Sequence, residues 1–491
     1  MKILVSEIAA ARKVMAQERT RRRLVNLVFV VYWLVIFEGV LRKWIWPQYS
    51  PYLFFIRDPF VLIIYFIVLK NGMWPRAQAM LIFAYGLALL AVIWTIIQLL
   101  TGEIMGPMVL LAGYGWRNYF LYIPLAFIIA QQFRQDDLYR LIRQTLIIAI
   151  PIAFLVMAQF AAPSDAVINS SVAGEGESAA FKAFRGGLGH IRPYGTFSSF
   201  RGQIQFVVTS ITMVLIAWII PTKQRPIPGL LLVLGASAAL ACLAVSVSRS
   251  SFIHAGLVVT SALVAGFALR GKMAARAWLL PTGLVIVALI LYPIVFPDAL
   301  SAFIARWSEG GALESQAFGS LGVFGRAFYE FYDFVRLIDN TPLFGYGMGL
   351  GGNAASVLGV KINGVIPLLI AESDWGRHFI DVGPILAIAF IIFRIILTAW
   401  LGVQAFAATR RSGNPMAVLL FGYVGVVLLY GQVTGHGSVT GYAWLFAGFL
   451  MAAIQSAQTQ EKVGKKEGPG SGPPIRAEPA KILHKRVNIA R

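Results

Sequence analysis

Charged residues are scarce in this chain of 491 residues, of which 13% are charged and 58% are hydrophobic. With so little charge, many segments can cross a lipid core of about 30 Å as helices. The chain also lacks the alternating segments of about ten residues that build transmembrane β-barrels. The sequence therefore predicts an all-α fold, that of a polytopic helical membrane protein.

Cysteine is nearly absent as well. The single Cys242 lies inside an apolar run, which excludes an intrachain disulfide framework and a thiolate metal cluster. The histidines show none of the spacings that zinc sites use, and the chain has no Gly-x-Ser-x-Gly nucleophile motif; they are His190, His254, His378, His436 and His484. We therefore expect chemistry that needs neither a metal ion nor another cofactor.

The net charge of +20 does not point to nucleic acid, because the cations gather in short stretches between apolar runs. About twelve runs have the length of a membrane span. They lie near 24–41, 52–69, 79–99, 118–131, 140–161, 203–220, 228–247, 251–269, 277–296, 379–402, 416–433 and 438–456.

Short cytoplasmic loops carry an excess of Lys and Arg, and this rule sets the expected orientation. Every second connection is basic, from the stretch 12–23 to Arg410 and Arg411. We expect both termini in the cytoplasm and two long outer loops, about 162–202 and 297–378, the second between spans 9 and 10. Residues 1–456 then form the membrane domain, and 457–491, rich in Gly, Pro and Lys, form a disordered cytoplasmic tail.

Several arginines on the predicted outer face stand apart from ordinary loop charges. Arg249 occupies the very short turn Ser248-Arg249-Ser250 between two apolar runs, which places it at the membrane edge. A guanidinium there can hold a phosphate with two hydrogen bonds, although a lone arginine can also anchor a helix end to lipid phosphate. The convergence of several on one face favours a binding site; the others are Arg117, Arg192, Arg201 and Arg326.

Carboxylates follow near the start of the tenth span. Glu372 lies at the outer lip, where it can accept a proton from a hydroxyl group, whereas Asp381 is expected to cap or brace a helix. Asp374, Arg377 and His378 are close in sequence. His378 can be a base or a structural histidine, and we favour the structural role.

Charges inside the first two spans are costly in lipid and are usually paired within the protein. We expect Arg57 to form an ion pair with Glu38 or Asp58. The glycines of 345–352 match a dinucleotide fingerprint only superficially, since no βαβ unit surrounds them. They predict tight turns with positive φ.

Four short motifs between about 185 and 400, taken in order, resemble the bacterial O-antigen ligase and O-antigen polymerase superfamily. They are Arg192-Pro193-Tyr194-Gly195-Thr196-Phe197; Ser248-Arg249-Ser250; Arg326 with the later Asn340-Thr341-Pro342-Leu343-Phe344-Gly345-Tyr346-Gly347; and Glu372-Ser373-Asp374-Trp375 leading to Asp381-Val382-Gly383. The region before 185 resembles the family only as a set of membrane helices.

The resemblance implies a glycosyltransferase of the bacterial inner membrane with about twelve helices and a large periplasmic loop over its site. Its substrate would be a glycan on undecaprenyl pyrophosphate, and its chemistry inverting and metal-independent. By matching positions, Glu372 would activate the acceptor hydroxyl, while Arg249 and Arg326 would hold the pyrophosphate as its charge grows. Further substrate-binding candidates are Arg192, Arg201, Arg117 and Arg377.

The usual ligase has histidine at the position of Glu372, which favours a polymerase that builds O-antigen, capsule or exopolysaccharide. Expected partners are the lipid-linked glycan, the bilayer and a protein that regulates chain length, but no nucleic acid. One alternative is a ligase that moves the glycan to a lipid or protein. Another is a transporter or flippase of lipid-linked sugars, which needs charged groups near the bilayer midplane and access from both faces.

Overall fold

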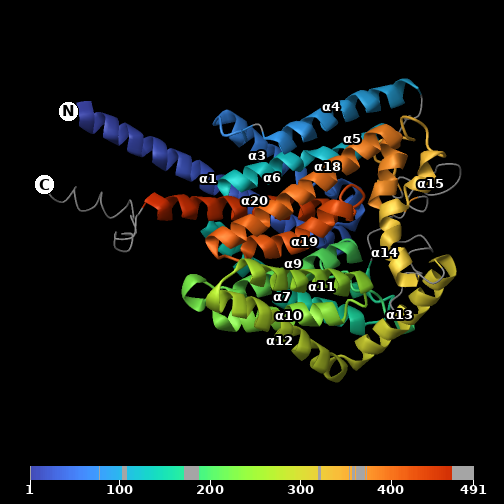
Figure 1. The fold of residues 1–491 in the computed structure, drawn as a ribbon. Coiled ribbons are helices and arrows are strands. Elements are labelled where there is room, and N and C mark those ends of the chain that lie inside the picture. Colours follow the sequence, from blue (N-terminus) through green and yellow to red (C-terminus); the bar gives the residue numbers. More distant parts are fainter. Residues whose placement is uncertain are drawn as a thin grey trace.

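The computed structural model describes residues 2–76, 78–101, 108–170, 187–318, 322–352, 354–355, 360, 371 and 373–466, and Figure 1 shows their arrangement. Within this part of the chain the regular structure is entirely helical, as predicted. The first half contains α1 (Lys2–Val40), η1 (Leu41–Ile45), η2 (Pro47–Tyr49), α2 (Ser50–Leu53), α3 (Asp58–Lys70), α4 (Ala79–Leu100), α5 (Met108–Trp116), η3 (Arg117–Leu121), α6 (Ile123–Gln132), α7 (Gln135–Ala161), η4 (Val167–Asn169), η5 (Gly187–Gly189), α9 (Phe200–Ile219), η6 (Thr222–Gln224) and α10 (Gly229–Ala244). The second half contains α11 (Arg249–Ala268), α12 (Gly271–Val295), α13 (Pro297–Phe318), α14 (Gly322–Tyr332), α15 (Val335–Ile338), α18 (Asp374–Ser412), α19 (Met416–Tyr430) and α20 (Gly437–Lys466).

Eight helices of the described part are long and apolar enough to cross a membrane, namely α1, α4, α7, α9, α11, α12, α18 and α20. Of their apolar windows, 94% is buried in α9 and α20 but only 6% in α12. An apolar helix that is not covered by protein suits contact with lipid. These are the helices of a multi-pass membrane protein.

The predicted count of twelve spans is not confirmed. The apolar helices α10 and α19 have 16 and 15 residues, and α3 and α6 have 13 and 10. A span needs about 20 residues. Within the predicted outer loop 297–378, the described residues contain α13, α14 and α15. One boundary differs from the prediction: α20 continues through 457–466, which were expected in the disordered tail.

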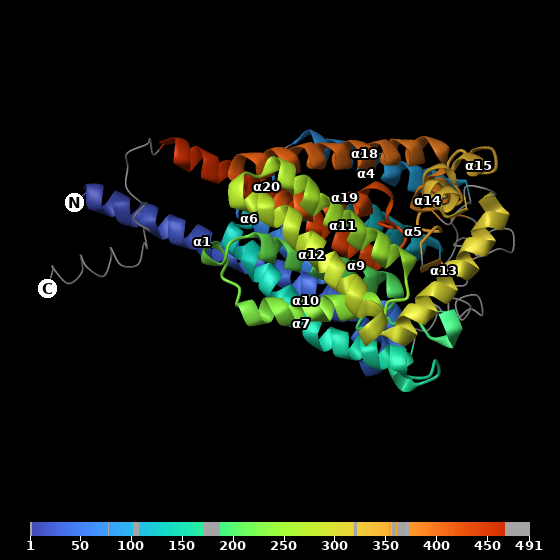
Figure 2. The ribbon, with the colours of Figure 1, turned by 60° about the horizontal axis from the view of Figure 1, so that its bottom comes forward.

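The two ends of the bundle have different characters. Figures 1 and 2 both show α13, α14 and α15 at one end, while the start of α1 and the finish of α20 project from the other. At that second end Arg21 forms an ion pair of 2.6 Å with Asp137. The cations of 12–23 therefore lie beside those near the start of α7, Arg134 and Arg140.

A sharp break divides α18 in two. Gly383 has φ 69° and ψ 176°, so the short piece Asp374–Val382 turns back against the rest of the helix. Asp374 and Arg394 are twenty residues apart yet 2.7 Å from each other, whereas an unbroken helix would separate them by about 30 Å. The predicted span 379–402 therefore contains this break.

The break leaves few polar backbone groups exposed to the apolar interior. Three carbonyl oxygens just before it, those of Ile380, Asp381 and Val382, accept hydrogen bonds from the Tyr346 backbone N–H, Gln98 Nε2 and Trp94 Nε1 at 2.8, 2.9 and 2.9 Å. Non-helical backbone at membrane depth needs such partners. The 343–349 segment that supplies one of them has the predicted positive φ at Gly345, Gly347 and Gly349.

We expect Gly383→Ala to lower the melting temperature of the protein markedly. Alanine rarely adopts φ 69°, and its Cβ would meet the Leu343 carbonyl oxygen and lie 2.7 Å from the Gly345 nitrogen. Gly72→Ala is the matched control, since Gly72 has φ 63° but no neighbour within 4 Å of an added Cβ. Equal shifts for the two variants would show that only the φ matters and that the close approach at Gly383 does not.

Candidate functional site

Four arginines form what we call the arginine cluster: Arg192 before α9, Arg201 in α9, Arg249 at the start of α11 and Arg306 in α13. Burial and the charges of the other three lower the pKa of Arg192 to about 9. Burial and the nearby charge of Arg249 also lower the pKa of Arg306. All four arginines are partly exposed, and the charges of Glu309 and Glu314 act on Arg306 in the opposite direction. A bound anion would relieve the remaining repulsion between the like charges.

Helix α13 lies directly over Arg249. The Arg249 Nη1 and Nη2 atoms donate to Glu314 Oε2 and Oε1 at 2.8 and 2.7 Å. An added Cβ on Gly310 would come within 2.8 Å of this guanidinium, so the missing side chain makes room for it. The Trp307 ring centre is 5.8 Å from Arg249 Cζ. Thus α13 contributes a carboxylate, an aromatic ring and a close backbone approach.

The segment that carries Arg192 is held by two buried side chains from other helices. Lys43 Nζ donates to the Gly195 carbonyl oxygen at 2.8 Å, and the Gly195 N–H donates to Gln159 Oε1 at 2.7 Å. The Phe200 ring lies 4.9 Å from Arg192 Cζ, within the range of a cation–π contact. The segment of Arg192 is therefore held by η1, the π-helical extension of α1, and by α7.

The loop between α19 and α20 links the cluster to the start of α18. His436 in this loop is buried, and burial together with the charges of Arg201 and Arg377 holds its pKa well below the usual range. Arg377 Nε donates to the Ala371 carbonyl oxygen at 3.3 Å. Residue 371 directly precedes Glu372, which lies outside the described residues.

The junction of α14 and α15 is hydrogen-bonded to the start of α18. Asp333 between them accepts hydrogen bonds from the Ser373 N–H and hydroxyl at 3.2 and 3.1 Å, and the Ser373 hydroxyl in turn accepts from the Gly376 N–H at 2.9 Å. Ser373 is thus the N-cap of α18. Arg326 lies within α14, after its first turn, and its side chain is outside the described part of the chain.

Behind the loop lies a buried hydrogen-bonded network. Arg394 Nη1 contacts both Asp374 Oδ2 at 2.7 Å and His378 Nε2 at 3.0 Å. Tyr119 lies between His378 Nδ1 at 2.7 Å and Asp381 Oδ2 at 2.9 Å. One arrangement of protons satisfies all of them: Arg394 donates to Nε2, the Nδ1–H donates to Tyr119, and Tyr119 donates to Asp381.

This network holds neighbouring parts of the chain together. Asp381 Oδ1 also accepts from the Gly351 N–H at 2.6 Å, so it joins the 343–351 segment to α18 as the predicted bracing carboxylate. Both ring nitrogens of His378 have partners, which fits the structural role that we favoured. We therefore assign this network a structural role and place the candidate chemistry at the arginine cluster.

Arg117 belongs to a separate group of buried charges. Its Nε is 2.8 Å from Asp58 Oδ2, and it also donates to Asn118, Tyr122 and the Phe54 carbonyl oxygen. All three of its nitrogens have protein partners, so we leave Arg117 out of the proposed anion site. The predicted ion pair of Arg57 with Glu38 is confirmed, with Nε and Oε2 3.0 Å apart in a geometry that falls short of a hydrogen bond.

Arg192 thus lies within electrostatic reach of Arg201 and Arg249, and His436 within reach of both Arg201 and Arg377. Sequence reasoning missed Arg306, Glu314 and the location of His436. A signal was present: residues 306, 310 and 314 are four apart, the spacing of one helix face. The prediction placed that stretch within the long outer loop 297–378, where α13 now lies.

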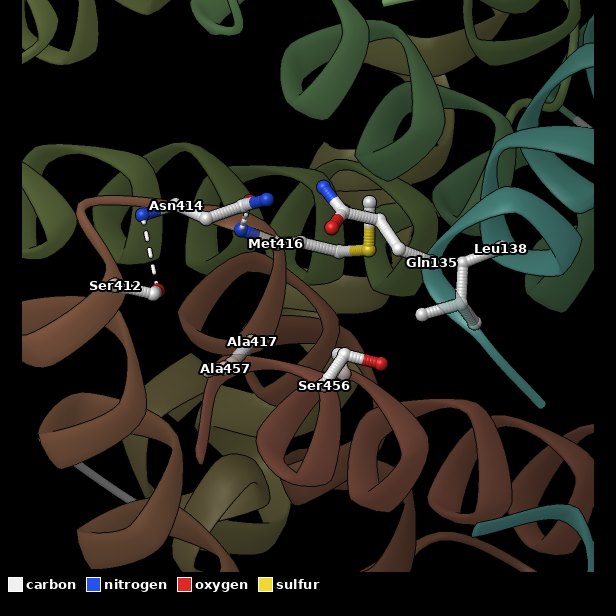
Figure 3. Close-up of a pocket in the computed structure, with 9 residues that line it drawn as sticks. Gln135, Leu138, Ser412, Asn414, Met416, Ala417, Ser456 and Ala457 are labelled. Atoms are coloured by element: carbon white, nitrogen blue, oxygen red, sulfur yellow. Dashed lines mark hydrogen bonds between the residues drawn. The ribbon is translucent and has the colours of Figure 1, made fainter. Parts of the chain in front are cut away.

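The opposite end of the bundle has a small crevice without charged side chains (Figure 3). Its lining consists of Gln135, Leu138, Ser412, Asn414, Met416, Ala417, Ala453, Ser456 and Ala457. The Asn414 N–H donates to Ser412 Oγ and the Met416 N–H to Asn414 Oδ1, so these polar groups serve the turn between α18 and α19. We assign no chemistry to this crevice.

No protein-family model matches this chain, and none of the curated proteins matches it significantly. In the described part of the chain, no group of three or more His, Cys, Asp or Glu side chains is arranged to hold a metal ion. The function must be inferred from the arginine cluster and its surroundings.

Proposed function

We propose that this protein is an integral membrane glycosyltransferase that polymerises undecaprenyl-pyrophosphate-linked oligosaccharide repeats into a surface polysaccharide. The observation that carries the proposal is the arginine cluster, in which four guanidinium groups from distant parts of the chain come together. Arginine is well suited to bind phosphate oxygens in pairs, and it stays charged at biological pH. A diphosphate is the kind of anion that such a cluster fits.

The proposed reaction is a single displacement with inversion. The acceptor hydroxyl oxygen forms a bond to the anomeric carbon, while the bond from that carbon to the pyrophosphate oxygen breaks and its electron pair leaves with the pyrophosphate. Glu372 takes the hydroxyl proton. Arg249 and Arg326, assisted by Arg192 and Arg201, stabilise the charge that grows on the leaving group. Because Arg377 contacts the Ala371 carbonyl oxygen and acts with Arg201 on His436, we keep it as a substrate-binding residue.

The orientation forms part of the proposal. Twelve membrane crossings, with α3, α6, α10 and α19 as the shorter ones, would put both termini in the cytoplasm of a bacterial inner membrane. The end of the bundle with α13, α14 and α15 would then face the periplasm, where lipid-linked repeats and a chain-length regulator are expected. The basic residues gathered at the end with α1 and α20 support this choice.

The buried charges of α18 bear on the transporter alternative, which requires charged groups inside the bundle. Arg394 and Asp374 are such groups. Arg394 donates to the Leu428 and Gly431 carbonyl oxygens, both at 2.7 Å, besides Asp374, and Asp374 accepts from the Val433 N–H at 3.0 Å. These contacts fix one arrangement of the loop and of both halves of α18, which favours a static brace over a moving gate.

The test is an assay of purified protein with a polyprenyl-pyrophosphate oligosaccharide, with EDTA and without nucleotide, read by mass spectrometry. We expect ladders of repeats from the wild type and none from Glu372→Gln, because the amide cannot take the proton. Transfer only to an added lipid or protein acceptor would mean a ligase. Movement of the lipid across vesicles without any transfer would instead support the transporter.

A further inference from the structure

Glu314 occupies both outer N–H groups of the Arg249 guanidinium. Its two oxygens fill the fork of Arg249 at 2.7 and 2.8 Å, and this paired geometry is the one by which a guanidinium binds phosphate. The Arg249 and Glu314 side chains are 23% and 9% exposed. A phosphate and the Glu314 carboxylate cannot use the same two N–H groups at once.

Helix α13 has few buried side chains, so the ion pair between Glu314 and Arg249 matters for its position. Among its described side chains the buried ones are Ala299 and Ala302 near its start and Glu314 near its end. The helix packs mainly against α12, α14 and η5, at the end of the bundle shown in Figure 2. Two alanines contribute little apolar burial. The ion pair with Arg249 joins the second half of α13 to the start of α11, in addition to the contacts of the helix with α14 and η5.

We propose that Glu314 is an internal competitor for the substrate anion, and that displacing it from Arg249 releases the second half of α13 from the arginine cluster. The inference rests on the proposed function only in taking the cluster as the pyrophosphate site. The helix caps the cluster while no anion is bound. A diphosphate displaces the cap because its oxygens reach several guanidinium groups, whereas a single carboxylate is satisfied by one.

This arrangement also sets which anions can enter. An anion with one carboxylate gains no more from Arg249 than Glu314 already provides, so it does not lift α13. A diphosphate carries more charge and more acceptor oxygens, and it gains from Arg192, Arg201 and Arg306 as well. Glu314 therefore makes the site selective for highly charged phosphates.

The test measures binding of inorganic pyrophosphate to the purified full-length protein by calorimetry at low ionic strength. We expect Glu314→Gln to bind at least roughly tenfold more tightly than the wild type, since the anion no longer has to break a charge-assisted pair. Asp298→Asn is the matched control, because Asp298 is an exposed carboxylate in the first turn of the same helix. It should bind like the wild type.

Arg249→Ala separates the two proposals. If it binds pyrophosphate as well as the wild type does, the anion site itself is wrong. If it binds weakly while Glu314→Gln binds no more tightly than the wild type, the anion site stands and the competitor role of Glu314 is overturned.

A second measurement needs no variant and decides the matter even if Glu314→Gln does not fold. Amide hydrogen exchange of residues 303–316 in the wild type should become faster when pyrophosphate is added, because the second half of α13 is released. Acetate, added as a monovalent carboxylate, should leave the exchange unchanged. Slower or unaltered exchange with pyrophosphate would refute the release of α13.

Discussion

Arg249→Ala should reduce glycan extension by roughly 10²–10³-fold, the cost of removing one group that stabilises the charge of a transition state. Arg249 is the guanidinium on which the contacts with α13 converge, and it lies at the start of α11. Arg249→Lys should also be impaired, because an ammonium group keeps the charge but not the paired geometry.

The measurement is the length distribution of the product formed from the lipid-linked oligosaccharide, with membrane insertion checked in parallel. Arg270→Ala is the matched control, since Arg270 is an exposed arginine just beyond the other end of α11. Extension at the wild-type rate by Arg249→Ala, in protein that remains in the membrane, would reject a role for this arginine in holding pyrophosphate.

Asp374→Asn should destabilise the protein by about 3–5 kcal/mol, the range found when one partner of a buried ion pair is removed. Asp374 is fully buried, and its loss of charge would leave the Arg394 guanidinium, itself 3% exposed, without its counter-charge. The variant would also weaken the hydrogen bonds that Asp374 accepts from Val433 and Thr434. We expect a large drop in melting temperature in detergent.

Arg22→Ala serves as the comparison for this second prediction. Arg22 pairs with Glu18 at 3.0 Å but is 73% exposed, and such surface pairs contribute about 0–1 kcal/mol. Similar melting temperatures for the two variants would mean that the Asp374–Arg394 pair does not hold the two halves of α18 together. Arg377 lies in the short piece of α18, Asp374–Val382, and Ser373, which follows Glu372, is its N-cap. A loss of stability in Asp374→Asn would therefore also explain a lower activity, although Asp374 does not contact the substrate.

Local features of the chain account for much of what the sequence predicted correctly. Long apolar runs form helices in lipid whatever their neighbours are, since each helix satisfies its own backbone. Charges near the ends of adjacent spans need partners close by, which is why Arg57 could be matched to Glu38. Positive φ at Gly345, Gly347 and Gly349 follows from the preference of glycine itself.

The count of spans is not confirmed where a helix is short or broken. The segments 52–69 and 118–131 are apolar enough to be taken for spans. In the first, the α-helix α3 begins only at Asp58, after a series of turns. In the second, residues 117–121 form the π-helix η3, and the α-helix α6 begins only after it. Gly383 followed by Pro384 marks a break in the sequence, yet the direction in which the chain turns depends on Trp94, Gln98 and Tyr346. Hydropathy does not contain that information.

By itself, then, the sequence determined that this is an all-helical membrane protein with arginines at the edge of its spans. It did so because hydrophobicity, helix formation and glycine conformation act over a few residues. Only the tertiary structure decided that Arg306 joins Arg192, Arg201 and Arg249, that Glu314 occupies the fork of Arg249, and that Asp374 meets Arg394. These contacts join residues that are distant in the chain, and they depend on how whole helices pack, which no short stretch of sequence specifies.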